Sequence, residues 1–218
     1  ERHAPPEALR AHDRDQTFPY DVYAAWAEAG LLGLPFPEEI GGLGGSVVDL
    51  AIVSFELSRV SADLAMAYGG SVFCGLNILR KGSEEQVRHF LPPMMKGETR
   101  FAIGISEPDA GSDVGAIKTF ARRDGDRYVV NGQKLWMTGG GLRNTIISAY
   151  VRTDREAHYR KGMSLLLIDN DTPGVECRKL EMLGRKCVGT YEVFFRDVTV
   201  SRDRLIGGDG DDLIDGGT

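Results

Sequence analysis

The sequence lacks the features that mark membrane-spanning and nucleic-acid-binding proteins. No run approaches the roughly 18 consecutive apolar residues that a membrane span needs. The 26 Lys and Arg residues are fewer than the 32 Asp and Glu residues, which leaves a net charge of -6, and they are scattered along the chain. A dispersed minority of basic residues offers no concentrated positive patch to a polyanion. We therefore expect neither a membrane nor a nucleic acid as a partner.

Cysteine is also scarce. Cys74, Cys177 and Cys187 are the only cysteines, and they are odd in number and widely spaced. This pattern favours reduced thiols in a reducing compartment over a disulfide framework, so we expect a cytoplasmic protein. The chain begins at Glu1 without a basic or apolar leader. We therefore expect a secretory signal to be absent or already removed, and we expect the first residues to end a helix whose beginning is missing.

Two kinds of site have no support in the sequence. The four histidines, His3, His12, His89 and His158, lie far apart, and none has a cysteine or carboxylate at metal-ligand spacing. No Gly-x-Gly-x-x-Gly run follows a strand and opens a helix, so a Rossmann nucleotide site is not indicated either. We expect no metal.

Helical patterning dominates the first hundred residues. Ser46 with Asp49, and Ser83 with Gln86, have the spacing of capping boxes at helix starts. Apolar stripes with helical spacing follow them, and glycines stand where helices would end. The pattern predicts helices at 19–29, 46–64, 69–80 and 83–96.

From about Phe101 the pattern changes to strands. Alternating and β-branched residues are separated by Asp124-Gly125 and Asn131-Gly132, dipeptides that favour hairpin turns, so consecutive antiparallel strands are predicted there. Further strands are predicted at 145–151, 163–168, 175–179 and 191–195. Helices first and strands afterwards indicate an α+β protein with two segregated parts rather than an alternating parallel sheet.

The segment Gly104–Ala116 reads GISEPDAGSDVGA and is the most informative loop. A strand runs directly into small and hydrogen-bonding residues, which would let the backbone approach a ligand and offer N–H groups and hydroxyls to it. The alternative is an ordinary Asp- and Gly-rich turn whose polar side chains satisfy their own backbone.

A second informative segment, Asn131–Gly141, reads NGQKLWMTGGG. Trp136 and Thr138 stand on a strand before three glycines and could offer an aromatic wall and a hydroxyl to a planar ring. The alternative is a core tryptophan at a strand end before a flexible turn.

Together the two segments resemble the acyl-CoA dehydrogenase family, with the run from Gly104 and the segment 134–138 in the order and spacing of its signatures. Further matches, at 30–33, 37–42, 183–184 and 195–198, extend the resemblance to about Gly208. The resemblance implies an N-terminal orthogonal α-helical bundle at 1–99 and a middle antiparallel β-barrel or sandwich at 100–206. It also implies a C-terminal four-helix domain, which we expect to be missing.

By this resemblance the cofactor is FAD. Its site would comprise Ile103, Ile105, Ser106, Gly111, Ser112, Trp136, Met137 and Thr138. Ser112 would also contact the substrate, and the Thr138 hydroxyl would lie near flavin N5. The catalytic base of the family is usually a glutamate of the C-terminal domain, so we assign no catalytic residue. Glu107 is expected to bond the backbone and order its loop.

The implied activity is α,β-dehydrogenation of an acyl-CoA thioester to the trans-2-enoyl-CoA, a step of fatty acid metabolism. An electron-transfer flavoprotein or similar acceptor would take the electrons, and the complete protein would be a homo-oligomer, a homotetramer in many relatives. The fragment alone would be inactive. Alternatives are an acyl-CoA oxidase, a nitroalkane oxidase or a flavin monooxygenase on the same scaffold, or a non-catalytic module.

The tail at 207–218 departs from the family, which would continue into a long helix. Gly207–Asp215 fits one nonapeptide of calcium-binding β-helices, but such turns need about three stacked repeats. A fusion with a calcium-binding repeat is therefore the alternative to a frayed acidic end or a truncation.

Overall fold

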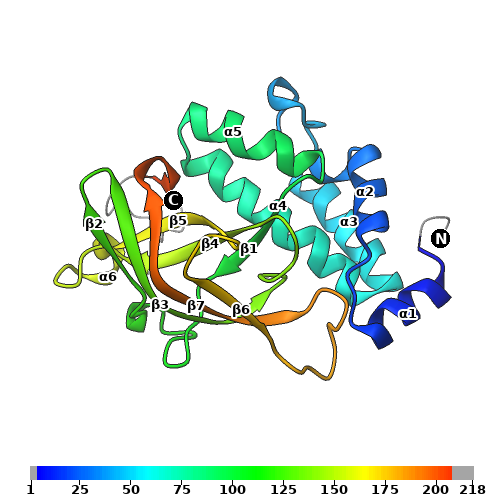
Figure 1. Ribbon diagram of the computed structural model, residues 1–218. Helices are drawn as coiled ribbons and strands as arrows, with labels where there is room; N and C mark the ends of the chain where they lie inside the picture. The colour runs from blue at the N-terminus through cyan, green and yellow to red at the C-terminus, as the bar shows by residue number, and fades with distance from the viewer. Residues whose placement is uncertain (1–3, 208–218) are drawn as a thin grey trace.

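The computed structural model describes residues 4–207, in which helices come first and strands afterwards (Figure 1). The helices are α1 (Pro6–Asp15), α2 (Tyr20–Glu28), α3 (Val47–Val60), α4 (Ala62–Lys81), α5 (Glu84–Met95) and the short α6 (Tyr159–Gly162). The strands are β1 (Arg100–Gly104), β2 (Phe120–Asp124), β3 (Arg127–Thr138), β4 (Thr145–Arg152), β5 (Met163–Asp169), β6 (Val175–Lys179), β7 (Thr190–Ser201) and β8 (Leu205–Ile206). This arrangement confirms the predicted α+β class, and the expected tail from 208 onward lies outside the described residues.

Both predicted capping boxes are present. The Ser46 hydroxyl accepts a bond from the Asp49 N–H and the Asp49 carboxylate accepts one from the Ser46 N–H, and Ser83 with Gln86 repeats the arrangement. Each box satisfies N–H groups that a helix start leaves without an internal acceptor. Helices α3 and α5 therefore begin where their local sequence predicts.

The predicted single helix at 46–64 is wrong, because the chain breaks it at Ser61. Ser61 is extended, with φ -160° and ψ 129°, and it ends α3 and begins α4. Leu64 is buried as expected, but it belongs to α4, and Val60 on the same predicted stripe is 53% exposed. A stripe continuous in sequence thus crosses a change of chain direction that periodicity alone does not reveal.

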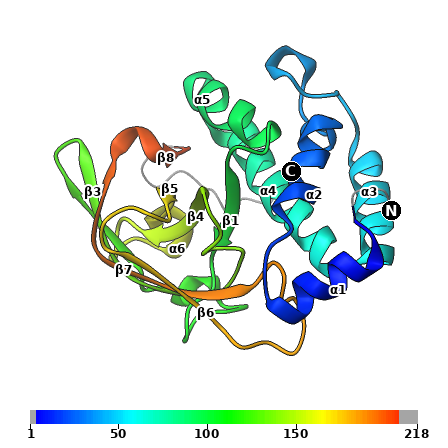
Figure 2. The same cartoon turned by 45° about the vertical axis from the view of Figure 1, so that its right-hand side comes forward.

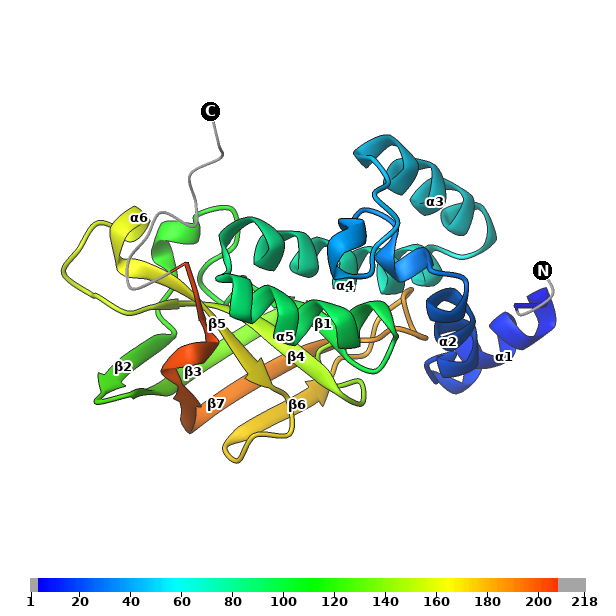
Figure 3. The same ribbon diagram turned by 90° about the horizontal axis from the view of Figure 1, so that it is seen from above.

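Helix α4 is the central helix of the helical part. Tyr68, Val72 and Ile78 are fully buried, and the helix packs against α3, α5 and β1. By length and composition α4 would pass for a membrane span, with a mean hydropathy of 1.2 over an 18-residue stretch. Half of that stretch is buried inside the protein, and Figures 2 and 3 show α4 between the other helices and the strands. Its apolar character serves this packing.

The strands form one eight-stranded sheet in the order β6-β7-β3-β2-β4-β5-β8, with β1 paired to β4. Most pairs are antiparallel, but β1 is parallel to β4. Because side chains alternate across a strand, β1 sends Phe101 to the core shared with the helices and Ala102 to the core within the strands. On β5, Leu165 and Leu166 divide in the same way. The sheet is therefore filled on both faces, and β1 joins the two parts.

The predicted hairpin at Asp124-Gly125 is confirmed, since β2 and β3 pair antiparallel around it. The predicted turn at Asn131-Gly132 is wrong, because β3 continues through it with a bulge opposite β7. Gly132 has φ +149° and lies against Thr119, while the Asn131 side chain bonds Asp197 of β7. An Asn-Gly pair provides positive φ for a bulge as readily as for a turn, and pairing with β7 decides between them.

We predict that Gly132→Ala destabilises the protein by about 3 kcal/mol, the sum of a strained backbone and an overpacked contact. A Cβ at Gly132 would come within 2.5 Å of Thr119 Oγ1 and within 2.7 Å of its Cα. Urea unfolding monitored by circular dichroism measures the change.

Gly125→Ala is the matched control. Gly125 also has positive φ, +63°, but no atom lies within 4 Å of an added Cβ. Its cost should be only the backbone strain, about 1 kcal/mol. Equal losses in the two variants would show that the contact with Thr119 does not limit Gly132.

Candidate functional site

Strand β1 and the loop that follows it carry five of the eight residues predicted to bind the cofactor, Ile103 on the strand and the other four on the loop. Ile103 is partly buried against the helical core, and Ile105 packs in a small cluster with Ala110, Ile117 and Met163. Ser106 is partly buried, whereas Gly111 and Ser112 are exposed. The loop thus has an anchored beginning and an accessible middle.

The middle of this loop is a tight turn with unused hydrogen-bond donors. Glu107 N–H donates to the Ala110 carbonyl over 2.8 Å, and Ala110 N–H donates back over 3.2 Å. In residues 4–207, the N–H groups of Ser106 and Ser112 find no backbone acceptor. An added Cβ at Gly111 would meet no atom within 4 Å. The loop can therefore offer N–H groups to a ligand that approaches the backbone closely.

Glu107 orders this loop, as expected from the sequence. Its buried carboxylate accepts bonds from the N–H groups of Lys118, over 2.7 Å, and Thr119, over 3.0 Å. Burial acts to raise the pKa of Glu107, but the bonds from Lys134, Thr119 and Lys118 outweigh it and hold the pKa below its usual value. Glu107 is thus an ionised structural group that joins the two ends of the loop.

Lys134, from β3, is the site residue that sequence reasoning missed. Its side chain is fully buried, and its ammonium donates to a Glu107 carboxylate oxygen over 2.8 Å and to the Ile105 carbonyl over 2.9 Å. Burial lowers the pKa of Lys134 to about 8, while Glu107 opposes the shift. The signal that the sequence offered was a lysine on a predicted strand, within one of the two informative segments. Its burial is seen only in the structure.

Immediately after Lys134, β3 bulges and exposes Trp136. The pairing with β7 shifts register between Lys134 and Met137, and Trp136 has φ +62°. This conformation is rare for a bulky residue and costs about 1–3 kcal/mol, so the surroundings must hold it. The Trp136 residue is 56% exposed, whereas the neighbouring Met137 is fully buried. Met137 therefore presents neither its side chain nor its backbone at this surface.

The two informative segments lie side by side. Leu135 N–H donates to the Ser106 carbonyl over 2.8 Å, which joins the bulge to the loop directly. Thr138, at the end of β3, is partly exposed, and its hydroxyl lies 3.5 Å from Nη1 of Arg185. The exposed indole, a hydroxyl and the free N–H groups of the loop therefore come from adjoining pieces of backbone, a donor and aromatic set that suits the isoalloxazine ring of a flavin.

A cationic cavity of about 520 Å³ lies at the far end of the same loop. It is lined by Gly115, Ala116, Ile117, Lys118, Arg152 and Arg155. Arg152 donates through Nη2 to two backbone carbonyls, but its buried Nη1 has no partner in the described part of the chain. None of the predicted cofactor residues lines this cavity. Its charge suits an anionic group such as a phosphate.

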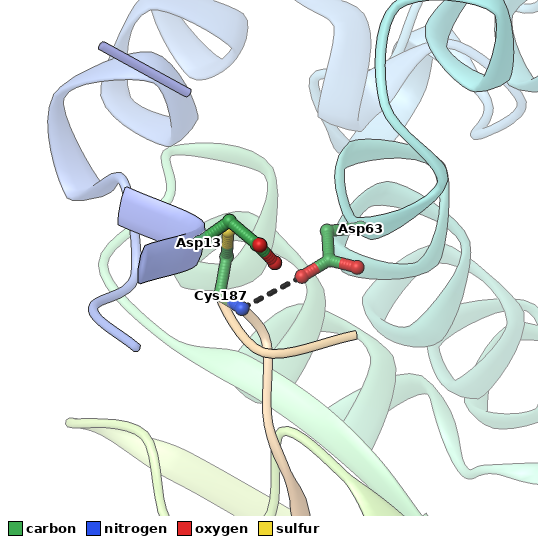
Figure 4. A group of neighbouring side chains, drawn as sticks. All are labelled: Asp13, Asp63 and Cys187. Carbon is green, nitrogen blue, oxygen red and sulfur yellow. Dashed lines mark hydrogen bonds between the residues drawn. The ribbon is translucent and has the colours of Figure 1, made fainter. Parts of the chain in front are cut away.

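A different cluster lies where α1, α4 and the β6–β7 connection meet (Figure 4). The side chains of Asp13, Asp63 and Cys187 place their possible ligand atoms within 4.8 Å of one another. Asp63 accepts bonds from the N–H groups of Cys187, over 2.7 Å, and Val188, over 3.3 Å. Burial, with Asp63 and Asp13, raises the pKa of the Cys187 thiol to about 12. Asp63 thus has a structural role, because it holds the β6–β7 connection against α4, and in the absence of a cation the Cys187 thiol stays protonated near neutral pH.

Comparison with known proteins identifies the two parts. Residues 1–98 match the N-terminal domain of acyl-CoA dehydrogenases, and residues 102–198 match the middle domain. A short-chain specific acyl-CoA dehydrogenase of Clostridium acetobutylicum is 36% identical over 91% of this chain and 52% of its own length. The chain thus spans about half the length of that relative.

Solved structures agree. An acyl-CoA dehydrogenase from Geobacillus kaustophilus has a TM-score of 0.85 at 34% identity, over 92% of this chain and 53% of its own. A glutaryl-CoA dehydrogenase from Mycobacterium smegmatis in complex with FADH2 has a TM-score of 0.82 at 26% identity, over 90% and 50% of the two chains. The chain described here belongs to the acyl-CoA dehydrogenase family.

Proposed function

We propose that the full-length protein that carries this sequence is an FAD-dependent dehydrogenase that converts an acyl-CoA thioester to its trans-2-enoyl-CoA. The observation that carries the proposal is the exposed Trp136, held at positive φ beside a loop with free N–H groups. Strained, exposed aromatic residues are costly and are typically retained where a ligand covers them. The family membership and the relative in complex with FADH2 support FAD as that ligand.

FAD, when bound, supplies the acceptor for the hydride that leaves the β-carbon of the substrate. In the proposed site Trp136 would hold the ring, and Thr138 with the N–H groups of Ser106 and Ser112 would supply hydrogen bonds to its polar edge. Ile103 on β1, with Ile105 and Gly111 on the loop, would shape this part of the site, and Met137 is buried directly after Trp136 on β3. Fixed donors of this kind stabilise developing negative charge best where water is excluded.

We propose that the cationic cavity binds phosphate groups of coenzyme A. Ser112 is exposed on the loop that runs in sequence from the proposed flavin site to Lys118 at the cavity. Arg155 is exposed at the cavity and stacks 4.2 Å from the Phe120 ring centroid, so its guanidinium is oriented before a ligand arrives. An acyl-CoA could then span both places.

The three carboxylates of the loop are all engaged in structural bonds, so we assign none of them as the catalytic base and propose that the base belongs to another part of the full-length protein. Glu107 is buried and paired with Lys134, Asp109 bonds Lys118 over 2.9 Å, and Asp113 accepts a bond from the Gly115 N–H. A carboxylate held ionised by several donors is a weak base. We further propose a cytoplasmic homo-oligomer, a homotetramer, that acts in fatty acid metabolism and passes its electrons to an electron-transfer flavoprotein or a similar acceptor.

Anaerobic titration of the full-length flavoprotein with acyl-CoA esters of graded chain length tests the function. We expect the flavin absorbance to bleach at a stoichiometric amount of ester, with the enoyl-CoA as product. Reduction by a nitroalkane instead, or no reduction by any ester, would assign the scaffold to another chemistry.

We predict that Trp136→Ala slows flavin reduction by about tenfold or more, because a misplaced ring loses its alignment with the substrate. The same change should alter the free energy of unfolding by no more than about 0.5 kcal/mol, since the side chain is exposed. Stopped-flow absorbance and urea unfolding measure the two effects. Phe55→Ala removes an equally exposed aromatic residue from α3 and should change neither. An unchanged reduction rate in Trp136→Ala would remove Trp136 from the site.

We predict that Arg155→Gln weakens binding of an acyl-CoA ester by about threefold at low ionic strength and less at high salt, because partly exposed charges are screened. Isothermal titration at two salt concentrations measures the effect. Arg122→Gln on β2, whose arginine pairs with Asp124, is the matched control with the same loss of charge. Equal effects of the two variants would leave only a net-charge contribution and exclude a specific site at Arg155.

A further inference from the structure

We propose that Lys134 and Glu107 form a positioning pair that aims the Ser106 N–H at the flavin and holds the loop at 105–119, the signature loop, in register with Trp136. This inference rests on the proposed function, because it names residues that act on the same site without touching the ligand. The pair lies inside the protein, whereas the loop and the indole that it supports are on the surface.

The ammonium of Lys134 bonds the loop on both sides of Ser106. It donates to the Ile105 carbonyl and to the Glu107 carboxylate, and the next residue of β3 donates its N–H to the Ser106 carbonyl. Three consecutive loop residues are thus bonded by two consecutive strand residues. A shift of the loop by one residue along β3 would break all three bonds, so the pairing specifies one register.

The bond to the Ile105 carbonyl also fixes a direction. The Ile105 carbonyl and the Ser106 N–H belong to the same planar trans peptide, in which the two groups point opposite ways. Because Lys134 binds the carbonyl from the protein interior, the Ser106 N–H points away from that interior. This N–H is one of those without a backbone acceptor in residues 4–207. Lys134 therefore presents a donor that it does not itself contact.

Glu107 extends the constraint to the other end of the loop. The carboxylate that binds Lys134 also accepts the N–H groups of Lys118 and Thr119, so the loop closes on one side chain. Removing either partner leaves a buried charge without compensation and costs several kcal/mol, whereas replacing both by neutral groups of similar size is often tolerated. Because replacing both partners is often tolerated, the positioning role can be tested in a variant that still folds.

The test compares Glu107→Gln/Lys134→Met with the parent. The double variant removes both charges while keeping the side-chain volumes close to those of the parent. Glu176→Gln/Arg196→Met is the matched control, since that pair is equally short, 2.8 Å, but exposed on β6 and β7. Neither residue of the control pair lies in the proposed site. The two single variants at 107 and 134 are expected to unfold at lower urea concentration than the double variant.

One readout needs no flavin. Collisional quenching of tryptophan fluorescence by acrylamide, in the chain described here, reports chiefly Trp136, because the other tryptophan, Trp26, is 8% exposed. We expect a changed quenching constant in the double variant, together with faster hydrogen exchange at Leu135, whose N–H loses its fixed acceptor. Parental quenching and exchange in the folded double variant would overturn the inference.

The second readout uses the full-length flavoprotein. We expect the double variant to bind FAD at least about tenfold more weakly and to shift the flavin midpoint potential, while the control pair changes neither. A folded double variant with the parental dissociation constant and potential would overturn the positioning role. A parent that binds no flavin would instead reject the proposed function, and the fluorescence and exchange measurements would still decide whether the pair sets the register.

Discussion

The buried ion pair between Lys134 and Glu107 is the constraint on which the geometry of the site depends. An ammonium that is fully buried must have its donors satisfied, because leaving a charge unpaired in the interior costs several kcal/mol. Among residues 4–207, the acceptors that meet this requirement for Lys134 are the Ile105 carbonyl and the Glu107 carboxylate. If the loop moved away from β3, the Lys134 ammonium would become exposed to solvent or would stay buried without an acceptor. A surface loop is thus held in one conformation by an ion pair inside the protein.

Strand β1 transmits this constraint to the helical part. Its Phe101 N–H donates to the Ser71 hydroxyl of α4, and the same hydroxyl accepts a bond from Tyr23 of α2. At the start of the strand, the Arg100 guanidinium lies 4.8 to 5.6 Å from the ring centroids of three aromatic residues, Phe18, Tyr20 and Tyr23. These contacts bury a charge and two hydroxyls at the junction of helices and sheet. Because β1 leads directly into the signature loop, the orientation of the helices and the position of the loop are mechanically linked.

The features predicted correctly from the sequence are those that depend on neighbouring residues or on the preference of one side chain. Both capping boxes, the Asp124-Gly125 hairpin and the ordering role of Glu107 need only residues close in sequence or a strong side-chain preference. The bulge at Gly132 could not be predicted, because it is decided by the pairing of Asn131 with the distant Asp197. The break at Ser61 could not be predicted either, because the apolar stripe continues through it in the sequence, and only the fold shows that Leu64 is buried while Val60 is exposed. Lys134 was missed for the same reason, since a lysine on a strand is usually solvated and only the fold shows that its ammonium is enclosed. The prediction that the two informative segments lie close together rested on the family resemblance and not on periodicity.

Glu107 links the proposed flavin site to the cationic cavity that is proposed to bind phosphate. The loop that it closes begins beside Trp136 and ends at Lys118, which lines the cationic cavity. The carboxylate binds the Lys118 N–H at one end and the Lys134 ammonium at the other, so one side chain spans the distance between them. A ligand that pulled on the cavity end of the loop would therefore act on the Ile105 carbonyl through two hydrogen bonds and one ion pair. Packed, satisfied networks of this kind resist small continuous deformation. The proposed flavin end and the proposed phosphate end would then behave as one rigid unit, which would suit the proposed dehydrogenation, because its two hydrogen transfers need one substrate aligned between a base and a ring.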